Sequence, residues 1–549
     1  MGTTRPAGEV VEELAAPLPP APPRPSRWWV DAVLVAMLLP LAVIARRPGY
    51  LFSHAFWLDE GWVADSVRAP LHQLRLLTSS TPIGWTLLLR LIPDVGPPER
   101  LRALPLAFGV LSVVVAYLLG RQLGRVAAVA AGLAAALAPT ALRNHSLKQY
   151  SADAFVTLLL LWLTARVEAG WSRPRLVALC LACVPAVLIS HVTVFVSAAV
   201  LVALALRALV ERRWERLGWV VALGLGVAAI EAAVYLAFVA AGNSPALNRW
   251  WADDMVPLGD GLGPAASFLA ARSAEALGRV GFGPWPLAAA LVAAGLVALW
   301  RSRRPVVATA VCLLAAELLV GAVAGRYPFL DERTGLFFTT LLTVCGALGI
   351  AAVVAWSARR WATLPLGVAA AVGACLLLAP AAHTNAIHPM PPSTMRQQVS
   401  YVLAHRQPGD VVVVGMAASR GGIAWGSRRY ARDPSPPSGE LPILRPPLLP
   451  GQVVLHREQI RLDRGRGLLP ILVRKGKGPG GTLGCRWLIH RVSKLMEQVS
   501  ALMFLIMEKR DCVQQKKTAG DRGKTCQREL TPQRDVAGSH SSVVRAAPL

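Results

Sequence analysis

Residues 101–142 read LRALPLAFGVLSVVVAYLLGRQLGRVAAVAAGLAAALAPTAL, and this stretch decides the fold. It holds two apolar runs, Leu101–Leu119 and Val126–Leu142, joined by a short linker that contains Arg121 and Arg125. A helix needs roughly 17–25 apolar residues to cross a bilayer, and each run meets that length. The stretch therefore predicts two membrane spans with a basic turn between them.

The pattern continues along the chain, which has eleven apolar runs that could each be a span. The runs are Trp28–Ala45, Leu101–Leu119, Val126–Leu142, Tyr150–Ala165, Leu176–Ile189, Val192–Leu206, Leu217–Ala241, Trp285–Trp300, Val306–Ala324, Gly335–Trp356 and Leu364–Ala382. We therefore expect an all-α polytopic membrane protein with eleven transmembrane helices. Only Ser190 and His191 separate the fifth and sixth runs, which predicts a tight helical hairpin.

Composition agrees with this class. Of the 549 residues, 54% are hydrophobic and 16% are charged, whereas soluble domains carry roughly 25% charged residues. The formal net charge of +25 would suggest nucleic-acid binding if it were spread over one domain. However, residues 428–549 hold 23 Lys and Arg against 10 Asp and Glu, so 13 of the 25 net charges lie in the last fifth of the chain. We therefore expect no nucleic-acid partner.

The arginines orient the spans. With the N-terminus in the cytoplasm, every predicted cytoplasmic loop carries at least two arginines, as the positive-inside rule requires, and Arg46 and Arg47 are outward-facing exceptions. In this orientation Pro82–Pro93, which is apolar but about half a span long, is predicted to be an interfacial or re-entrant helix on the outer face. The predicted location is the plasma membrane of a bacterium, with the active face outside the cytoplasm.

The sequence divides into four parts. Residues 1–27 are predicted to be a disordered cytoplasmic leader, and residues 28–382 a transmembrane domain with large outer loops at 46–100 and 242–284. Residues 383–427 begin a small, incomplete α/β segment outside the membrane, with a helix at Met395–Arg406 and a strand at Val411–Val414. Residues 428–549 form a basic tail of low order.

The tail differs in style from the rest of the chain. Lys148 is the only lysine before residue 428, and seven lysines follow it. We hypothesise that the tail is not native coding sequence, for example because of a frameshift. A genuine disordered basic tail is the alternative.

The first outer loop contains the sharpest chemical feature, Asp59 and Glu60 between Trp57 and Trp62. Aromatic rings can stack on the faces of a sugar, and a carboxylate can accept a hydroxyl proton as a general base. The pattern therefore favours a sugar-handling site. A solvated acidic loop with tryptophans at the membrane interface is the alternative.

Two further outer features carry cations. Lys148 precedes Tyr150 and Asp153 where the fourth run begins, and its compact ammonium could bind a lipid phosphate. A carboxylate at membrane depth, such as that of Asp153, is a functional candidate. Arg333, between the ninth and tenth runs, could clamp a phosphate with its planar fork. The alternatives are a snorkelling lysine, an acid that favours the helix N-terminus, and a local ion pair of Arg333 with Asp331 or Glu332.

Other polar residues are interpreted as structural. Glu231 and Glu317 lie inside predicted spans, where a glutamate could serve a site or bond between helices. Cys180 and Cys183 are expected to pack rather than to bind metal.

Five pieces of sequence occur in order on the predicted outer side. They are Trp57–Glu60, Ser80–Trp85 with Leu87–Leu91, Glu99–Pro105, Lys148–Asp153, and Tyr327–Phe329 with Glu332–Thr334. In this order they resemble the motifs of the GT-C superfamily of glycosyltransferases, in its RgtA/B/C/D-like branch related to protein O-mannosyltransferases. The resemblance covers residues 53–415.

The resemblance implies an inverting membrane glycosyltransferase that uses a polyprenyl-phosphate-linked sugar as donor. Lipid, glycan or protein could be the acceptor, and membrane lipids would surround the enzyme. The implied roles are general base for Asp59, positioning of the acceptor or of a divalent cation such as Mg²⁺ or Mn²⁺ for Glu60, Asp153 and Tyr150, donor-phosphate binding for Lys148 and Arg333, and sugar stacking for Trp57 and Trp62. Only some family members need the cation. A polytopic transporter or lipid flippase, and an inactive homologue, are the alternatives.

Overall fold

The computed structural model describes residues 28–361, except 55, 57, 72–73, 75–80, 94–96, 144–145, 241–250 and 303, together with residues 411–413 and 471–473. Within the first range, the side chains of Leu58 and of residues 357–361 are also outside the description. Contact clustering divides the chain into two units, and the helices all belong to the unit that includes residues 1–443.

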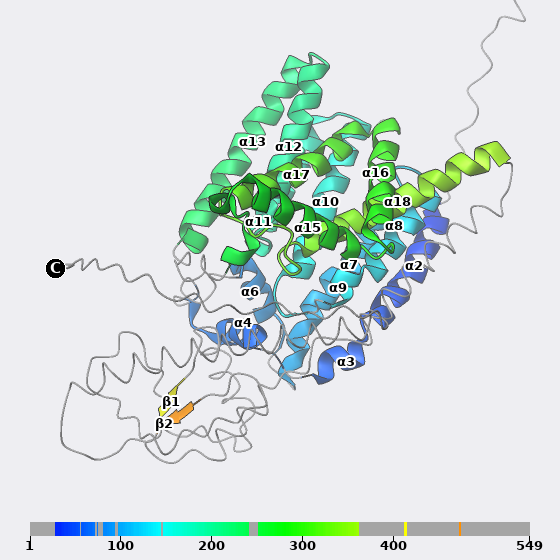
Figure 1. Cartoon of the computed structure of the whole chain (residues 1–549). Helices are drawn as coiled ribbons and strands as arrows, with labels where there is room; N and C mark the ends of the chain where they lie inside the picture. The colour runs from blue at the N-terminus through cyan, green and yellow to red at the C-terminus, as the bar shows by residue number, and fades with distance from the viewer. Residues whose placement is uncertain are drawn as a thin grey trace, which may run out of the picture. The chain divides into compact units, whose positions relative to one another are not determined.

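The described residues form a bundle of apolar helices, coloured from blue to green in Figure 1. The first half consists of α2 (Trp28–Ala45), α3 (Pro48–Ser53), α4 (Leu58–Arg68), α6 (Ile83–Arg90), the 3-10 helix η2 (Pro98–Arg102), α7 (Ala103–Gly120), α8 (Arg125–Leu137), α9 (Pro139–Arg143) and α10 (Tyr150–Ala169).

The second half begins with α11 (Arg173–Ile189), α12 (Thr193–Val210), α13 (Trp214–Val234) and the single π turn η3 (Tyr235–Val239). It continues with the 3-10 turns η5 (Ala252–Asp254) and η6 (Leu258–Asp260), and with α15 (Leu262–Arg279), α16 (Trp285–Arg301), α17 (Pro305–Val323) and α18 (Leu336–Trp361). The strands β1 (Val411–Val413) and β2 (Ile471–Val473) pair as a two-stranded sheet.

The helices confirm the predicted class of an all-α polytopic membrane protein. Within the described residues, seven segments are long and apolar enough to cross a membrane, and they contain α2, α7, α8, α12, α13, α17 and α18. The helices α10, α11 and α16 coincide with three further predicted spans. The predicted hairpin is present, because α11 ends at Ile189 and α12 begins at Thr193. The predicted span Leu364–Ala382 and helix Met395–Arg406 lie outside the described residues.

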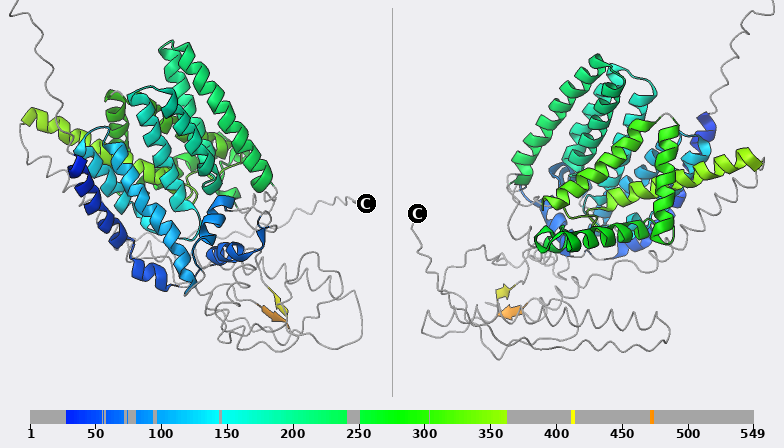
Figure 2. Two further views of the ribbon diagram at one scale, coloured as in Figure 1. Left: turned by 180° about the vertical axis from the view of Figure 1, so that it is seen from behind. Right: turned by 45° about the horizontal axis from the view of Figure 1, so that its top comes forward.

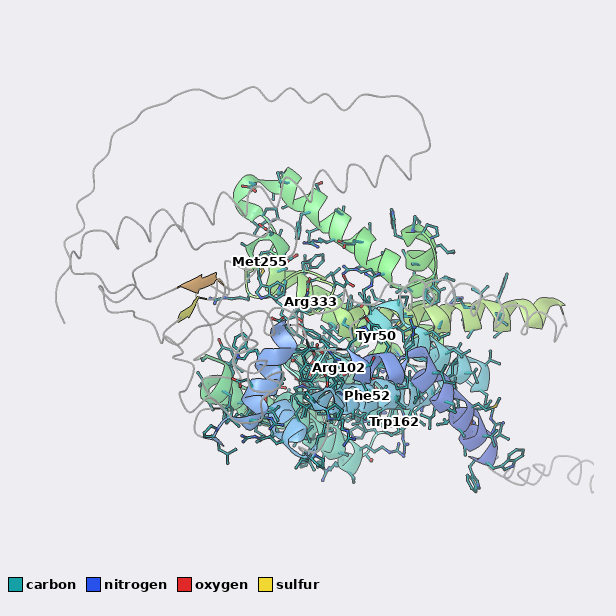
Figure 3. The ribbon with its side chains drawn as sticks, turned by 90° about the horizontal axis from the view of Figure 1, so that it is seen from below. Tyr50, Phe52, Arg102, Trp162, Met255 and Arg333 are labelled. Atoms are coloured by element: carbon teal, nitrogen blue, oxygen red, sulfur yellow. The ribbon has the colours of Figure 1, made fainter. Side chains whose placement is uncertain are left out.

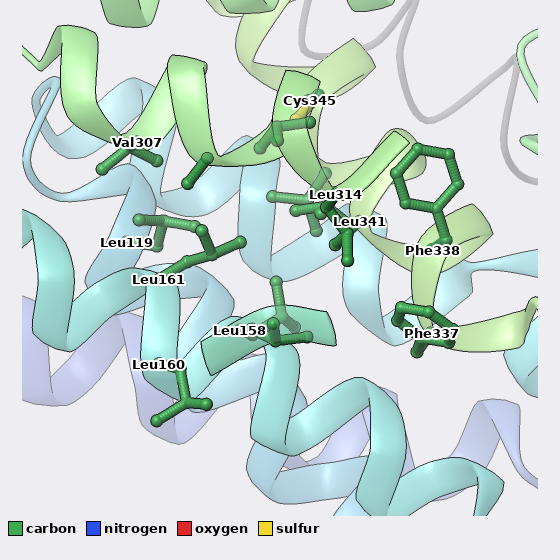
Figure 4. Packing of buried hydrophobic residues seen from close by; sticks show 14 of the residues in the cluster. Leu119, Leu158, Leu160, Leu161, Val307, Leu314, Phe337, Phe338, Leu341 and Cys345 are labelled. Atoms are coloured by element: carbon green, nitrogen blue, oxygen red, sulfur yellow. The ribbon is translucent and has the colours of Figure 1, made fainter. Parts of the chain in front are cut away.

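The core of the bundle lies where α10 packs against α7, α12, α17 and α18. Leu158, Leu160 and Leu161 of α10 are each at most 1% exposed and belong to one continuous hydrophobic cluster. Figure 4 shows these leucines beside Leu314 of α17 and Leu341 of α18. A helix that is apolar on all sides suits either lipid or the interior of a bundle, and most residues of α10 are buried by neighbouring helices.

Small residues allow two helices to approach closely. A Cβ atom added to Gly295 of α16 would collide with the carbonyl oxygen of Cys345 in α18, and one added to Gly349 would collide with that of Leu291. Close approach through glycine is a recurrent basis for helix association in membranes. The backbones of α16 and α18 are therefore in direct contact.

Arg46, one of the two exceptions to the arginine rule, is buried rather than exposed. Its guanidinium donates to the carbonyl oxygens of Ala42, Ala135 and Ala136, at 2.9, 3.4 and 3.3 Å. These carbonyls belong to the last turns of α2 and α8, where the helix dipole favours a cation. Arg46 thus caps two helix ends and does not report on membrane orientation.

The short helices gather at one end of the bundle. Figure 1 labels α3 and α4 at the lower end of the bundle, and the left view of Figure 2 shows these blue helices at that end from behind. The helix α4 packs on α6, α3 on η2, and α9 on α8 and α18. The acidic motif expected in a loop opens α4, so that Asp59 and Glu60 lie in its first turn, where carboxylates favour the helix dipole.

Candidate active site

Asp59 lies between two cations. Its Oδ2 atom is 3.1 Å from Nζ of Lys148 and 3.7 Å from Nη1 of Arg333. The side chains of Asp59 and Lys148 are 18% and 13% exposed, and that of Arg333 is 37% exposed. The structure thus brings together three residues that were predicted from separate motifs. The second distance is too long for a hydrogen bond, so Arg333 acts on Asp59 through charge alone.

Each of the three residues lies at or before the beginning of a helix. Asp59 is in the first turn of α4, Lys148 precedes α10 by two residues, and Arg333 precedes α18 by three. The first amide groups of a helix lack partners within it and, with the helix dipole, favour negative charge. The site can therefore attract an anion from several directions.

Glu60, next to Asp59, points into the protein. It is 2% exposed, and its two carboxylate oxygens accept hydrogen bonds from Nε and Nη2 of Arg102, at 2.9 and 2.6 Å. Its Oε1 atom also accepts the backbone N–H of Leu147 at 2.9 Å. Glu60 thus joins α4 to the residue before Lys148.

Arg102 is the centre of this arrangement. Its Nη1 atom donates to the carbonyl oxygens of Leu51 and His54, at 2.8 and 2.6 Å. Its guanidinium carbon is 4.8 Å from the centre of the Phe56 ring, within range of a cation–π interaction. The arginine thereby also holds the chain that leads from α3 to α4.

A small hydrophobic cluster supports the segment that carries Lys148. Trp85 of α6 is fully buried and donates from Nε1 to the carbonyl oxygen of Leu147 at 2.9 Å. Leu147 is itself fully buried and belongs to a cluster with Phe56, Trp85 and Leu89. Both backbone groups of Leu147 are therefore bound to buried side chains.

The loop that carries Arg333 is held by its own turn and by the second outer loop. Oδ2 of Asp331 accepts the backbone N–H groups of Arg333 and Thr334, each at 3.0 Å. Arg279 of α15 donates to the carbonyl oxygen of Leu330 at 2.7 Å. Tyr327 donates its hydroxyl to the carbonyl oxygen of Thr334 at 2.9 Å, and burial raises the pKa of this hydroxyl well above its usual value, so it remains a donor.

The remaining predicted site residues are placed differently. Tyr150 is buried and interacts electrostatically with Asp59, Arg333 and Asp153. Asp153 is 3% exposed and lies beside Ser190, inside the bundle. Trp62 is half-buried in α4, and Trp57 lies outside the described residues. Tyr150 therefore interacts both with residues of the Asp59 site and with the buried Asp153.

The next question is whether the described residues include a cluster of side chains that could hold a divalent cation. No three His, Cys, Asp or Glu side chains converge among them, and Asp59 and Glu60 each face a cationic side chain. Zinc and calcium sites draw their protein ligands from several such groups, whereas magnesium is usually held by one or two carboxylates and by phosphates of the substrate. A cation at Glu60, as the family resemblance implies, would therefore have to compete with Arg102 for the carboxylate.

Two residues of the site were not singled out from the sequence. Arg102 occurs in the third motif of the family resemblance and Trp85 in the second, but neither was given a role. Placing an arginine next to an apolar membrane helix costs free energy unless the charge is paired. The position of Arg102 directly before α7 therefore indicates a buried acidic partner. Figure 3 labels Arg102 and Arg333 at this end of the bundle.

No protein-family model and no curated protein sequence matches the chain. Several solved structures are similar to part of the chain. The oligosaccharyltransferase AglB of Archaeoglobus fulgidus, in complex with an inhibitory peptide and a dolichol-phosphate, is 13% identical with a TM-score of 0.48, and the match covers 78% of this chain and 62% of that one. A structure of the oligosaccharyltransferase of the same organism with Zn and sulfate is 15% identical with a TM-score of 0.46, covering 68% and 56%.

A bacterial structure matches over more of its own length. ArnT from Cupriavidus metallidurans, bound to undecaprenyl phosphate, is 16% identical with a TM-score of 0.45, covering 73% of this chain and 85% of that one. By contrast, the present chain spans 56–62% of the archaeal proteins. At these identities and TM-scores the activity of the chain must be inferred from its own residues.

Proposed function

We propose that the protein is a membrane glycosyltransferase that transfers a sugar from a polyprenyl-phosphate-linked donor to an acceptor hydroxyl. The observation that carries the proposal is the position of Asp59 between Lys148 and Arg333, at 3.1 and 3.7 Å. A carboxylate beside two cations provides both a proton acceptor and a binding site for a phosphate. The five ordered motifs of the GT-C resemblance support the same reaction.

In the proposed reaction, the donor phosphate binds first to the two cations. Lys148 offers a compact ammonium and Arg333 a planar fork, which suits phosphate oxygens. The phosphodiester anion competes with Asp59 for these cations, and its binding loosens the ion pair that holds the carboxylate. Asp59 is then free to approach the acceptor.

The chemical step exchanges one bond for another. The acceptor oxygen attacks the anomeric carbon from the face opposite the phosphate, and Asp59 accepts the hydroxyl proton. As the new carbon–oxygen bond forms, the bond between the anomeric carbon and the phosphate oxygen breaks, and the electron pair leaves with the polyprenyl phosphate. Lys148 and Arg333 stabilise the negative charge that grows on this phosphate. Attack from the opposite face inverts the anomeric configuration.

The position of the site fits a lipid-linked donor. The site lies at one end of the helices, next to Tyr150, the first residue of α10. The arginine pattern predicts that this end faces away from the cytoplasm. A donor whose polyprenyl chain stays in the outer leaflet would present its phosphate at that depth.

The test is sugar transfer in isolated membranes that contain the full chain. A panel of polyprenyl phosphates carrying radiolabelled hexoses or pentoses is offered, and the label is followed from the lipid fraction into acceptors. We expect at least one donor to be consumed by the wild type and not by membranes that lack the protein. Equal consumption in the two membranes for every donor would contradict the proposal.

A further inference from the structure

The hydrogen bonds of Glu60 indicate a structural role for this residue, distinct from proton transfer and from metal binding. We infer that Glu60 and Arg102 are positioning residues, which hold Asp59 and Lys148 opposite each other. The inference rests on the proposed function for its catalytic meaning, but the arrangement itself is a property of the fold.

The argument begins with adjacency. Glu60 follows Asp59 in α4, and Leu147 precedes Lys148. The hydrogen bond from the Leu147 N–H to Oε1 of Glu60, at 2.9 Å, therefore lies beside the ion pair between Lys148 and Asp59, at 3.1 Å. The two contacts join the same two segments at neighbouring residues, so a shift of one changes the other.

Both carboxylate oxygens of Glu60 are already bound within the protein, so neither is available to a substrate or metal ion. Both of its oxygens accept hydrogen bonds from Arg102, and the side chain is 3% exposed. A ligand would have to displace a buried, two-bonded arginine, and breaking such a pair is strongly unfavourable. The carboxylate is therefore occupied in holding the protein together at this point.

Arg102 extends the connection to the chain before Asp59. It donates to Leu51 and His54, which lie on the approach to α4, while it also holds Glu60 inside α4. Trp85 completes the arrangement from the other side by donating to the carbonyl oxygen of Leu147. The position of Lys148 relative to Asp59 is thus set by buried donors as well as by the partly exposed ion pair.

Two substitutions of Glu60 separate positioning from charge. Glu60→Gln keeps the length of the side chain and an oxygen that can accept from both Nε of Arg102 and the N–H of Leu147, but it removes the negative charge. Glu60→Asp keeps the charge but is one methylene shorter and cannot reach Arg102 and Leu147 together. A residue that acts through its charge on a substrate or metal would tolerate Asp better, whereas a positioning residue tolerates Gln better.

The experiment uses the purified full chain in lipid nanodiscs. Three quantities are measured for each variant: kcat and KM for sugar transfer, the dissociation constant of farnesyl phosphate as a probe of the phosphate site, and hydrogen–deuterium exchange at the Leu147 amide. Asp31→Asn is the matched control. Asp31 is also a carboxylate held by arginines, but it lies in the first turn of α2, at the end of the bundle away from Asp59. Arg102→Lys keeps the charge but cannot bind both oxygens of Glu60 at once, so it tests the same arrangement should Glu60→Gln not fold.

We expect Glu60→Asp to lower kcat about 100-fold, since a displacement of one ångström from reactive geometry has that effect, and to abolish the slow exchange at Leu147. Glu60→Gln should lose less than about tenfold in kcat and keep part of the protection, whereas Arg102→Lys should lose about as much as Glu60→Asp. Asp31→Asn should leave all three quantities unchanged. Farnesyl phosphate should bind more weakly to Glu60→Asp than to Glu60→Gln, since the displaced Lys148 is one of its two cations.

Several results would overturn the inference. Higher activity or tighter binding of farnesyl phosphate with Asp than with Gln would show that the charge of Glu60 acts on a ligand. An equal loss in Asp31→Asn would indicate general destabilisation. If the wild type transfers no sugar, the proposed function fails, but exchange at Leu147 and binding of farnesyl phosphate still decide whether Glu60 positions Lys148.

Discussion

Two carboxylates of the bundle are each held between two cations, at opposite ends of the helices. Asp31, in the first turn of α2, accepts from Nε of Arg121 at 2.9 Å, from Nε of Arg125 at 3.3 Å and from the hydroxyl of Tyr117 at 2.7 Å. Asp59 has Lys148 at 3.1 Å and Arg333 at 3.7 Å. The charges are alike, but Asp31 is bound by three side-chain donors and Asp59 is held more loosely.

The difference separates a carboxylate that holds helices together from one that we propose to be catalytic. Of the three donors of Asp31, Tyr117 lies in α7, Arg121 directly follows α7 and Arg125 begins α8, so the carboxylate ties three helix ends together. Around Asp59, the fixing is done by the neighbouring Glu60 with Arg102. This division leaves Asp59 and its cations available for a ligand, because the surrounding fold does not depend on their ion pair.

The largest expected difference between the two ends is in catalysis. Lys148→Gln removes a cation that stabilises the leaving phosphate, and we expect the transfer rate to fall about 100- to 1,000-fold, as for other lost electrostatic contacts to a transition state. Arg121→Gln, the corresponding change at Asp31, should leave the rate within about twofold, as expected for a residue remote from the reaction. Initial rates with a saturating labelled donor measure both. Comparable losses of transfer rate in Lys148→Gln and Arg121→Gln would contradict a catalytic role specific to the Asp59 end.

A smaller effect is expected in phosphate binding. Asp59→Asn removes the anion that competes for Lys148 and Arg333, so farnesyl phosphate should bind about tenfold more tightly, the size of one partly buried charge interaction. Isothermal titration calorimetry in nanodiscs measures the dissociation constant. Asp31→Asn should leave it unchanged. Weaker binding by Asp59→Asn would mean that Asp59 orders the cations instead of competing for them.

The smallest expected effect is on stability, and here the substitution of Asp31 should have a larger effect than that of Asp59. Asp31→Asn should destabilise the protein by about 1 kcal/mol, because three donors lose a charged acceptor at a partly exposed position. Asp59→Asn should change stability by less, since Glu60 and Arg102 fix the same segment. Thermal unfolding followed by intrinsic fluorescence, with 17 tryptophans in the chain, allows the comparison. A larger loss of stability in Asp59→Asn than in Asp31→Asn would show that the ion pairs of Asp59, and not those of Asp31, have the structural role.

Much of the fold follows directly from the sequence. The spans could be predicted because a helix in a bilayer must bury its backbone polar groups in its own hydrogen bonds and cover them with apolar side chains. Asp59 and Lys148, which are 89 positions apart, could be assigned to the same side because the arginines orient every span between them. The alternative proposed for Glu231, a bond between helices, agrees with its acceptance of the Ser197 hydroxyl at 2.7 Å.

The arrangement inside the site could not be predicted in the same way. Adjacent acidic residues such as Asp59 and Glu60 look equivalent in the sequence, but one faces Lys148 and the other is 2% exposed against Arg102. Which of them turns inward depends on where α4 begins and on how η2 packs beside it. Likewise, the sequence does not show that Asp153, predicted to position the acceptor or a cation, is 3% exposed and lies beside Ser190.

The most direct test of the central claim is sugar transfer by Asp59→Asn beside Asp31→Asn, in membranes that hold equal amounts of each protein. If Asp59 accepts the proton of the acceptor hydroxyl, its variant should lose transfer about 100- to 10,000-fold, as expected for loss of a general base, while Asp31→Asn stays within about twofold of the wild type. Transfer by Asp59→Asn at the wild-type rate would contradict the account.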